Sequence, residues 1–422
     1  MVEANDPSLK SWISISANSD FPIQNIPFGL LSSASGPHAA TAIGDQVLDL
    51  AELNHWGLLE NLQIPQANLE AESLNDLIGM GKPLTTALRN RIAELLSEDN
   101  AELRDNAAFR AKVLSPMADA VMLMPVSVGD YTDFYSSIDH ATNVGTMFRD
   151  PENALLPNWK HIPVGYHGRA SSIVVSGAKI HRPKGQQIPA DTTQPVFGPS
   201  KLLDFELEVA FVVGKNTELG DSVSTKAAEE HIFGLVLFND LSARDIQKWE
   251  YIPLGPFLAK NFGSVISPWI VTLEALENFR VDSYTQDPEV LPYLKSEGQK
   301  NYDINLTVDI EAPGQAPHTI CHSNFKYMYW NMCQQLAHHT VNGCNINVGD
   351  MCASGTISGP EPSSFGSMLE LSWKGTKPIP MPDGSERKFL KDGDACIMRG
   401  WAEKDGIRIG FGESRTEILA AK

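Results

Sequence analysis

An alternating segment near the middle of the chain, Leu202 to Val213, places two acidic side chains among apolar ones. Because strand side chains alternate with a period of two, Glu206 and Glu208 share one face, and Leu207 and its apolar neighbours share the other. The apolar face requires burial, so the two carboxylates are expected side by side at the edge of a core. Like charges that close repel and shift each other's pKa unless a cation lies between them. A cation site is one interpretation of this strand, and a solvated strand face is the other.

Two more acids lie in apolar or aromatic contexts. Asp133 belongs to a loop-like segment, Gly129 to Tyr135, and Asp240 ends an apolar run. His140 follows Asp133 within a turn or two, and it is predicted either as a general base near neutral pH or as a hydrogen-bonded structural histidine. All-oxygen ligand sets suit Ca²⁺, Mg²⁺ or Mn²⁺ rather than zinc. We therefore expect an oxygen cage formed by Asp133, Glu206, Glu208 and Asp240.

The composition is that of an ordinary globular protein, with 422 residues, 42% hydrophobic and 20% charged. This length predicts two or three folding units. A net charge of −19 argues against a nucleic-acid partner, whose phosphates would be repelled. Five scattered cysteines disfavour a disulfide framework or a zinc site and favour a reducing compartment. Without a signal-peptide pattern or a bilayer-spanning run, we expect a soluble, cytoplasmic protein that does not engage a membrane.

The order of the predicted elements divides the chain into two regions. Residues 1–122 contain short strands, including a hairpin over 42–50, and then helices over 84–96 and 103–113, which is typical of a small α+β or barrel-like module. Residues 123–422 are rich in strand-like segments separated by turns, which indicates a large mixed β-sandwich or roll. The predicted fold class is mainly β with α.

Within the larger region, a helix is expected over 325–332 and an exposed loop over 279–300. A strand is expected over 367–373, in which Glu370 lies among apolar residues. Glu370 is a candidate to orient and charge-stabilise His140, as an Asp does for the histidine of a hydrolytic triad.

The segment after Asp240 gathers polar side chains at helical spacing. If the stretch from Ala243 is helical, Arg244, Gln247 and Tyr251 share a face. A guanidinium, an amide donor and a phenol that face one cavity suit a developing oxyanion, and an ordinary polar helix surface is the alternative. Lys260 lies in an apolar, Pro-bracketed segment, where burial is costly without a partner. It is therefore predicted to pair with the acid cluster.

Five motifs together resemble the fumarylacetoacetate hydrolase family. They are Asp133-Phe-Tyr-Ser-Ser-x-x-His140, Pro163-Val-Gly-Tyr-His-Gly-Arg-Ala-Ser-Ser, Leu-Asp-x-Glu206-x-Glu208, Asn-Asp240-x-Ser-Ala-Arg-Asp-Ile-Gln247-x-Trp-Glu-Tyr251 and Gly355-Thr-Ile-Ser-Gly. The pattern of Glu206-x-Glu208 and Asp240 alone resembles the pattern found across the whole superfamily. The long second and fourth motifs resemble those of its fumarylacetoacetase branch. The resemblance extends from Asp20 to the C-terminus.

The resemblance implies an N-terminal SH3-like barrel region (1–122), a C-terminal β-sandwich roll (123–422) and a homodimer. It also implies hydrolysis of the carbon–carbon bond of 4-fumarylacetoacetate, a small diketo acid, to fumarate and acetoacetate, the last step of tyrosine and phenylalanine degradation. The implied cofactor is Ca²⁺, Mg²⁺ or both.

Site residues follow from the same resemblance, position by position. His140 corresponds to the proton acceptor, Glu370 to its partner, and Arg244, Gln247 and Lys260 to the oxyanion group. The implied substrate contacts are Tyr135, Arg149, Tyr166, Gln247, Tyr251 and Thr356. The implied metal ligands are Asp133, Glu206, Glu208 and Asp240, with a second cation position near Asp240, Lys260 and Ser264, where the family often has Thr in place of Ser264.

Two alternatives to this activity stay open at the level of sequence. One is another reaction of the same superfamily, acylpyruvate hydrolysis or oxaloacetate decarboxylation. The other belongs to a different class, a non-catalytic metal-binding scaffold. The presence of His140 and Glu370 beside the acid cluster favours an enzyme over a scaffold.

Overall fold

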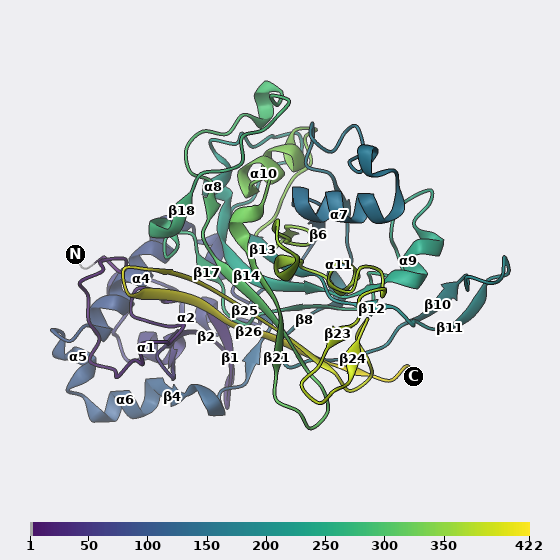
Figure 1. The fold of residues 1–422 in the computed structure, drawn as a ribbon. Coiled ribbons are helices and arrows are strands. Elements are labelled where there is room, and N and C mark those ends of the chain that lie inside the picture. Colours follow the sequence, from purple (N-terminus) through teal and green to yellow (C-terminus); the bar gives the residue numbers. More distant parts are fainter. Residues whose placement is uncertain (1–2) are drawn as a thin grey trace.

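The computed structural model describes residues 3–422 and contains three larger β-sheets (Figure 1). The N-terminal region, in purple and blue, lies at one end of the molecule, and the two sheets of the remaining chain lie beside it. Strands outnumber helices among the described elements, so the predicted fold class, mainly β with α, is confirmed. Among the described residues, no helix has both the length and the apolar character needed to cross a lipid bilayer.

The N-terminal region combines a five-stranded sheet, in the order β4-β3-β2-β1-β5, with six helices among its described elements. Gly44, with a φ of +59°, and Asp45 turn the chain between β2 and β3, which confirms the predicted hairpin. The helix predicted over 84–96 is α4, whereas the one over 103–113 is divided into α5 and α6 because the Asn106 side chain caps α6. The elements are β1 (Gly29–Ser33), β2 (Gly36–Ile43), β3 (Gln46–Asp49), α1 (Leu50–His55), α2 (Gln66–Leu69), α3 (Asn75–Gly79), α4 (Lys82–Leu96), α5 (Ala101–Arg104), α6 (Ala107–Val113), β4 (Leu114–Pro116) and β5 (Met122–Leu123).

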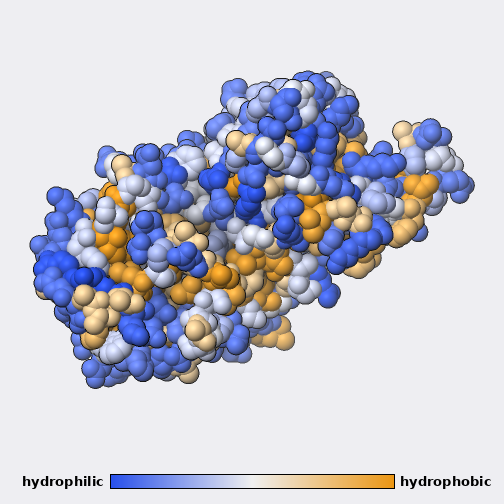
Figure 2. Space-filling view, turned by 90° about the horizontal axis from the view of Figure 1, so that it is seen from below, coloured by the Kyte–Doolittle hydropathy of each residue, from blue (hydrophilic) through white to orange (hydrophobic). Residues whose placement is uncertain are grey.

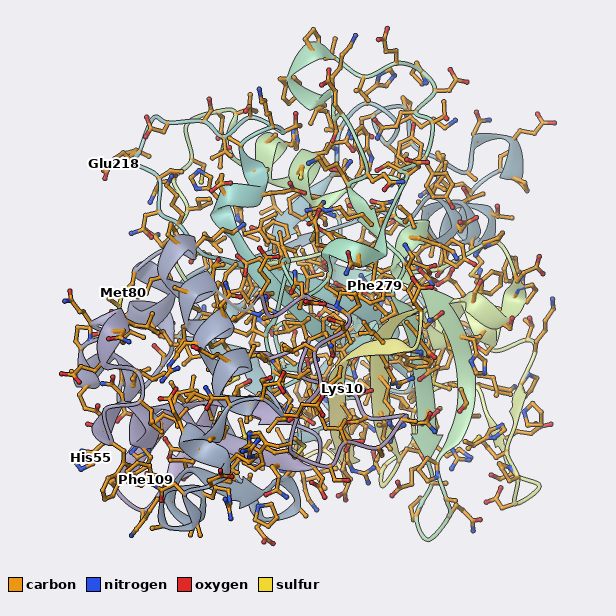
Figure 3. All side chains as sticks on the ribbon, turned by 90° about the vertical axis from the view of Figure 1, so that its left-hand side faces the viewer. Lys10, His55, Met80, Phe109, Glu218 and Phe279 are labelled. Carbon is orange, nitrogen blue, oxygen red and sulfur yellow. The ribbon has the colours of Figure 1, made fainter. Side chains whose placement is uncertain are left out.

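Aromatic contacts join the outer helices of this region. Trp56, at the end of α1, packs against His55 and against Phe109 of α6. Figure 3 shows His55 and Phe109 near each other at the outer edge of the molecule.

The central sheet has the order β7-β6-β22-β13-β14-β16-β8, with β17 paired to β14. Its β6–β22 and β16–β8 pairs are parallel and its other pairs antiparallel. The strands are β6 (Tyr131–Phe134), β7 (Gly165–His167), β8 (Ile173–Val175), β13 (Leu207–Val213), β14 (Ile232–Asp240), β16 (Ser264–Ile266), β17 (Val271–Thr272) and β22 (Met351–Ala353).

A second sheet, in the order β21-β20-β25-β26-β9, packs against one face of the central sheet. Contact is close: a Cβ atom added to Gly400 of β25 would lie 2.7 Å from the side chain of Leu237 of β14. The strands are β9 (Lys179–His181), β20 (Asn305–Glu311), β21 (His318–Asn324), β25 (Ala395–Lys404) and β26 (Ile407–Leu419).

Short helices and two-stranded sheets connect these layers. The helices are α7 (Ile138–Phe148), α8 (Ala228–His231), α9 (Arg244–Glu250), α10 (Met332–Thr340) and α11 (Met368–Leu371). The paired strands are β10 (Lys184–Gln187) with β11 (Val196–Pro199), β12 (Leu203–Asp204) with β15 (Ser242–Ala243), β18 (Arg280–Val281) with β19 (Asn301–Tyr302), and β23 (Ile379–Pro380) with β24 (Glu386–Arg387).

Both faces of β13 are buried. Leu207 and Val209 pack toward the second sheet, while Ala210 and Val212, on the face of Glu208, pack with the N-terminal region. Since neither face meets solvent, the interpretation of this segment as a solvated strand face is wrong, and its carboxylates are enclosed.

Four local predictions were wrong. Residues 367–373 do not form a strand, because the side chain of Ser367 accepts a hydrogen bond from the backbone N–H of Glu370 and starts helix α11. The helix predicted over 325–332 begins only at Met332, after a capping box formed by Asn331 and Gln334. Asp133 lies in strand β6 rather than in a loop. Within 279–300, Val290 and Leu294 are buried rather than exposed.

Candidate active site and metal centre

The four predicted carboxylates converge on the central sheet. Asp133, Glu208 and Asp240 belong to β6, β13 and β14, and Glu206 immediately precedes β13. One carboxylate oxygen from each of these four residues lies within 4.8 Å of the others, and all four side chains are buried. Strand β22 lies between β6 and β13 and pairs Ala353 with both Asp133 and Ala210. The pairing of these strands therefore fixes the spacing of the cluster.

Two cations partly balance the charge of the cluster. The Nζ atom of Lys260 lies 2.6 Å from Oε2 of Glu206 and 2.7 Å from Oδ2 of Asp240. Nη1 of Arg244 lies 2.7 Å from Oε1 of Glu206. Burial by itself raises the pKa of Glu206, but Lys260 and Arg244 outweigh that effect and hold this pKa below its usual value. The predicted pairing of Lys260 with the acids is confirmed.

The remaining oxygens fit a hard divalent cation. Asp133 Oδ1 and Glu208 Oε1 are buried and have no hydrogen-bond partner among the described residues. Burial, and then the neighbouring carboxylates, raise the pKa of both Asp133 and Glu208 well above the usual range. Buried oxygens without donors are costly, and a cation with oxygen preference satisfies them directly. Asp133, Glu206, Glu208 and Asp240 are thus able to hold a divalent metal ion.

A histidine–glutamate pair lies beside this cluster. His140, on α7, places its Nδ1 atom 2.6 Å from Oε2 of Glu370, on α11. Asn143, Ser358 and Ser367 also donate hydrogen bonds to the Glu370 carboxylate, at 2.9, 3.0 and 2.8 Å. Burial raises the pKa of Glu370, but His140 and these donors outweigh it and lower the pKa. His140 is also close enough to Glu206 to favour its ionised form.

The predicted oxyanion group is partly assembled. Helix α9 begins at Arg244, whose Nη1 donates to Oε1 of Gln247 at 3.1 Å, so the side-chain NH₂ of Gln247 points elsewhere. Arg244 Nη2 is buried without a partner among the described residues. Tyr251, the third member of the predicted face, lies beyond the end of α9 and is 49% exposed.

The remaining site candidates fall into two groups. Tyr166 donates to Oδ2 of Asp240 at 3.2 Å, and Ser264 donates to Oδ1 of Asp240 at 3.0 Å. The ring of Tyr135 packs edge-on against His140, with 5.2 Å between ring centres. Thr356 is buried, and its hydroxyl has no partner among the described residues. Arg149, in contrast, is exposed and donates to the carbonyl of Ala154.

Sequence reasoning missed several residues that hold this site together. Asn143 was recognisable, since it lies three positions after His140 on a helix and therefore shares its face. Ser367 carried a signal, because it lies three positions before Glu370, which is the Ser-x-x-Glu spacing of a helix start, and Ser358 lies within the Gly355-Thr-Ile-Ser-Gly motif. Asp204 was also missed, and it contacts both Arg244 and the backbone of α11.

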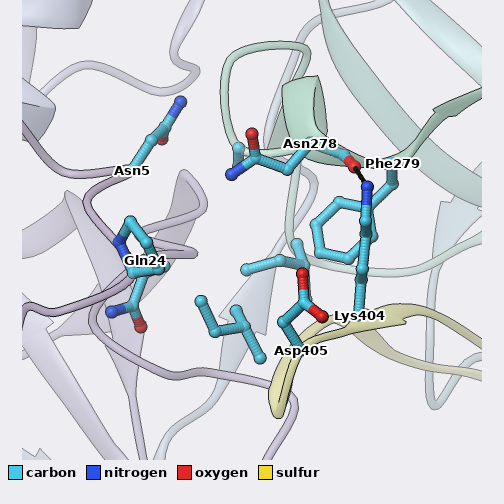
Figure 4. Close-up of a pocket in the computed structure, with 10 residues that line it drawn as sticks. Asn5, Gln24, Asn278, Phe279, Lys404 and Asp405 are labelled. Atoms are coloured by element: carbon cyan, nitrogen blue, oxygen red, sulfur yellow. Dashed lines mark hydrogen bonds between the residues drawn. The ribbon is translucent and has the colours of Figure 1, made fainter.

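A separate pocket lies away from the carboxylates, between the N-terminal segment and the β25–β26 turn (Figure 4). It has a volume of about 210 Å³, and Asn5, Gln24 and Asp405 face it. Lys404 Nζ donates to the carbonyl of Asn278 at its edge, at 3.2 Å. The residues that line this pocket include none of the four carboxylates and neither His140 nor Glu370.

Comparison with known proteins agrees with this geometry. Residues 24–125 match the family model "Fumarylacetoacetase N-terminal" and residues 131–418 match "Fumarylacetoacetate (FAA) hydrolase C-terminal". The chain is 54% identical to the fumarylacetoacetase of Homo sapiens, over 97% of this chain and 99% of that protein, and 54% identical to that of Caenorhabditis elegans, over 98% and 100%. A solved fumarylacetoacetate hydrolase from Exiguobacterium antarcticum shares the fold, with a TM-score of 0.52, 17% identity and coverage of 94% and 99%. The chain belongs to the fumarylacetoacetase family.

Proposed function

We propose that this enzyme hydrolyses the carbon–carbon bond of 4-fumarylacetoacetate to give fumarate and acetoacetate. The observation that carries the proposal is the His140–Glu370 pair, 2.6 Å apart, next to a cluster of four buried carboxylates. The family membership, at 54% identity to two curated fumarylacetoacetases, supports the same reaction. We propose that this reaction is the last step in the degradation of tyrosine and phenylalanine, and that the chain carries it out in the cytoplasm.

His140 is the proposed general base. Its Nδ1 atom faces Glu370, so its Nε2 atom is the one free to take a proton from water. The resulting hydroxide adds to the fumaroyl carbonyl of the substrate. The buried Glu370 carboxylate stabilises the imidazolium that forms, as the aspartate of a hydrolytic triad does.

Arg244, Gln247 and Lys260 are proposed to stabilise the tetrahedral oxyanion. Arg244 Nη2, which has no partner among the described residues, and the NH₂ group of Gln247 are available donors. Collapse of the adduct breaks the carbon–carbon bond, and the electron pair leaves with acetoacetate as an enolate. The proton held by His140 then returns to that enolate, which balances the reaction.

The divalent cation, Mg²⁺ or Ca²⁺, when held by Asp133, Glu206, Glu208 and Asp240, supplies positive charge and Lewis acidity to the bound diketone. We propose a second, minor cation position at Ser264, where the hydroxyl and Lys260 already contact Asp240. Tyr135, Tyr166 and Thr356 are the proposed substrate contacts from the buried side. Arg149 and Tyr251 are proposed to contact substrate from the exposed side.

We also propose that two copies of the chain form a homodimer. Large apolar side chains gather on the β10–β11 hairpin and on the segment after α9, where Phe197, Ile252 and Leu254 are 74%, 69% and 96% exposed. The hairpin projects from the body of the molecule in Figure 1, and Figure 2 shows apolar surface along it. Clusters of large exposed apolar side chains are typical of a protein interface.

The domain boundary is proposed between residues 122 and 123. One family model matches residues 24–125 and the other residues 131–418, so the proposed boundary lies close to the end of the first match. The five-stranded sheet of the N-terminal region ends at β5 (Met122–Leu123). We propose an SH3-like barrel for residues 1–122 and the β-sandwich roll for residues 123–422.

The test is a substrate panel with the purified protein, with and without a chelator. Fumarylacetoacetate should disappear, chelation should slow its loss, and Mg²⁺ or Ca²⁺ should restore the rate. Preference for a short acylpyruvate or for oxaloacetate would identify another reaction of the superfamily. Inactivity across the panel would support a metal-binding scaffold.

A further inference from the structure

Asp204 connects two parts of the site that are far apart in the chain. Its Oδ2 accepts a hydrogen bond from Nε of Arg244 at 2.8 Å. Its two carboxylate oxygens also accept from the backbone N–H groups of Met368, at 2.7 Å, and Leu369, at 3.0 Å. Met368 and Leu369 form the first turn of α11, the helix that carries Glu370.

We propose that Asp204 is a positioning residue that fixes the Arg244 guanidinium and the helix bearing Glu370 relative to each other. The inference rests on the proposed function, since it assigns Asp204 to the same hydrolytic site. Among the described residues, no hydrogen bond joins Asp204 to the acid cluster; Asp204 acts through Arg244 and through the backbone of α11.

The burial of Asp204 makes these contacts specific. The residue is fully buried, and each of its two oxygens accepts at least one hydrogen bond. A carboxylate offers about four acceptor sites and no donor. An asparagine of the same size has one oxygen, and its NH₂ group would face either the guanidinium or a backbone N–H, both of which are donors. Asp204→Asn therefore keeps the volume of the side chain but loses contacts either to the Arg244 guanidinium or to the backbone of α11.

The surrounding backbone shows the same convergence. Glu206 pairs with Ser367 through an isolated β-bridge, and Leu207 donates its backbone N–H to the carbonyl of Gly366 at 2.9 Å. The 204–207 segment thus runs beside the start of α11. From this segment the carboxylates of Asp204 and Glu206 both reach Arg244, and that of Asp204 also accepts from the backbone of α11. A shift of the Asp204 carboxylate would therefore move both the oxyanion donor and the partner of His140.

Arg244 and Glu370 both stabilise charges that form during the reaction rather than charges of the bound substrate. Arg244 meets charge that develops on the oxyanion, and Glu370 supports the imidazolium of His140. Loss of their alignment should lower kcat more than it raises KM. A displacement of about 1 Å costs about 10²-fold in rate when reacting groups are otherwise well oriented.

The experiment compares Asp204→Asn with a matched control, Asp394→Asn. Asp394 is also fully buried, pairs with Arg387 at 2.9 Å and accepts from the backbone N–H of Lys391, but it has no contact with the site. We expect the Asp204 variant to lose about 10²-fold in kcat with KM changed by less than about threefold. Asp394→Asn should lose stability and keep kcat.

A double-mutant cycle tests whether the effect of Asp204 on kcat depends on Arg244. If Asp204 acts through Arg244, Asp204→Asn combined with Arg244→Lys should lose much less than the product of the two single losses in kcat. If Asp204→Asn does not fold, Asp204→Glu keeps the charge, and its extra methylene should still displace both contacts and reduce kcat.

The outcomes separate the inference from the proposed function. A wild-type protein without activity on fumarylacetoacetate would overturn both. An active wild type together with wild-type-like kcat in folded Asp204→Asn or Asp204→Glu would overturn the inference alone. An equal fall of kcat in Asp394→Asn, or a rise of KM with unchanged kcat in the Asp204 variant, would overturn it as well.

Discussion

His140 and Glu370 lie 230 positions apart in the sequence, yet Nδ1 of the histidine is 2.6 Å from Oε2 of the glutamate. Helix α7 presents the ring and helix α11 presents the carboxylate, and both groups are buried. A contact of this length between a buried imidazole and a buried carboxylate fixes both the orientation of the ring and the nitrogen that carries the proton.

Replacement of Glu370 by Gln should abolish most turnover without unfolding the protein. Gln keeps the size of the side chain, but it removes the charge that stabilises the His140 imidazolium. By comparison with triad enzymes, we expect kcat to fall by about 10³- to 10⁴-fold, with a small change in KM. Steady-state kinetics measure this, and circular dichroism verifies the fold. A kcat near that of the wild type would contradict the assigned role of Glu370.

Glu370 should also make the stability of the fold decrease as the pH falls in the acid range. The pKa of Glu370 lies below its ordinary value of 4.5, because His140 and the hydrogen-bond donors outweigh burial. A group with a depressed pKa stabilises the fold above its unfolded pKa, and this stability is lost as the pH falls through the folded pKa. The difference in free energy of unfolding between the wild type and Glu370→Gln should therefore shrink as the pH falls below 4.5.

Urea denaturation at a series of pH values measures this difference. Glu413→Gln is the control, because Glu413 pairs with Arg399 at the surface, where an ion pair contributes little. A difference for Glu370→Gln that stays the same down to the acid limit of folding would contradict a depressed pKa.

The acid cluster was predictable because each carboxylate carries a local signal. Glu206 and Glu208 stand out in an alternating apolar segment, and Asp240 ends an apolar run. Once such residues are assigned to buried strands, an unpaired carboxylate there is costly, so convergence on a cation or a basic group follows from physical chemistry. Lys260 was predictable for the same reason.

The scaffold around Glu370 was predictable only at the Ser367 cap, which has the local Ser-x-x-Glu spacing, because tertiary contacts create the rest. The apolar alternation of 367–373 favours a strand, but the Ser367 cap and the Asp204 carboxylate stabilise a helical turn there. Asp204 is 164 positions from Met368 in the sequence, and no local pattern announces that contact. Tyr251 shows the opposite error: helical spacing placed it on the face of Arg244, but α9 ends before it.

Divalent cations should raise the thermal stability of the protein. Binding to the folded state alone stabilises by mass action, by about 2.7 kcal/mol at a cation concentration 100 times the Kd. Saturating Mg²⁺ or Ca²⁺ should therefore increase Tm after chelator treatment. Glu208→Gln should abolish this increase, because the unpartnered Oε1 of Glu208 is one of the expected ligands.

The matched control is Asp309→Asn. Asp309 is buried on the second sheet, where it pairs with Arg399, and it lies outside the acid cluster. Its variant should keep the cation-induced increase in Tm. Differential scanning fluorimetry measures these changes in Tm. An equal cation-induced increase in Tm in Glu208→Gln and in the wild type would contradict a cation site at the cluster.

A charge on the exposed apolar surface should disrupt self-association. Leu254 is 96% exposed beside other apolar side chains, which is unfavourable in a monomer and favourable in an interface. Leu254→Glu should shift the protein from dimer to monomer in light scattering coupled to size-exclusion chromatography. Leu219→Glu is the control, since Leu219 is 82% exposed elsewhere on the molecule. A monomeric wild type, or a dimer unaffected by Leu254→Glu, would contradict an interface there.

A second buried histidine–carboxylate pair should matter for stability rather than for turnover. In the N-terminal region, His38 Nδ1 lies 2.8 Å from Oδ2 of Asp49, and His38 Nε2 lies 2.8 Å from the hydroxyl of Ser35. The order Ser–His–Asp is that of a hydrolytic triad. Asp49, however, is also the N-cap of α1, where its Oδ1 accepts from the backbone N–H of Glu52 at 3.0 Å. The pair therefore joins a β-hairpin to the start of a helix.

Asp49→Ala should destabilise the protein and leave kcat unchanged. It removes a helix cap, at a cost of about 1 kcal/mol, and leaves the buried His38 without its partner, at a further cost of about 1 to 3 kcal/mol. Asp45→Ala is the matched control, because Asp45 lies in the exposed turn only four positions earlier. Urea denaturation should give a lower midpoint for Asp49→Ala alone. A large fall in kcat in folded Asp49→Ala would instead show that the N-terminal region takes part in the reaction.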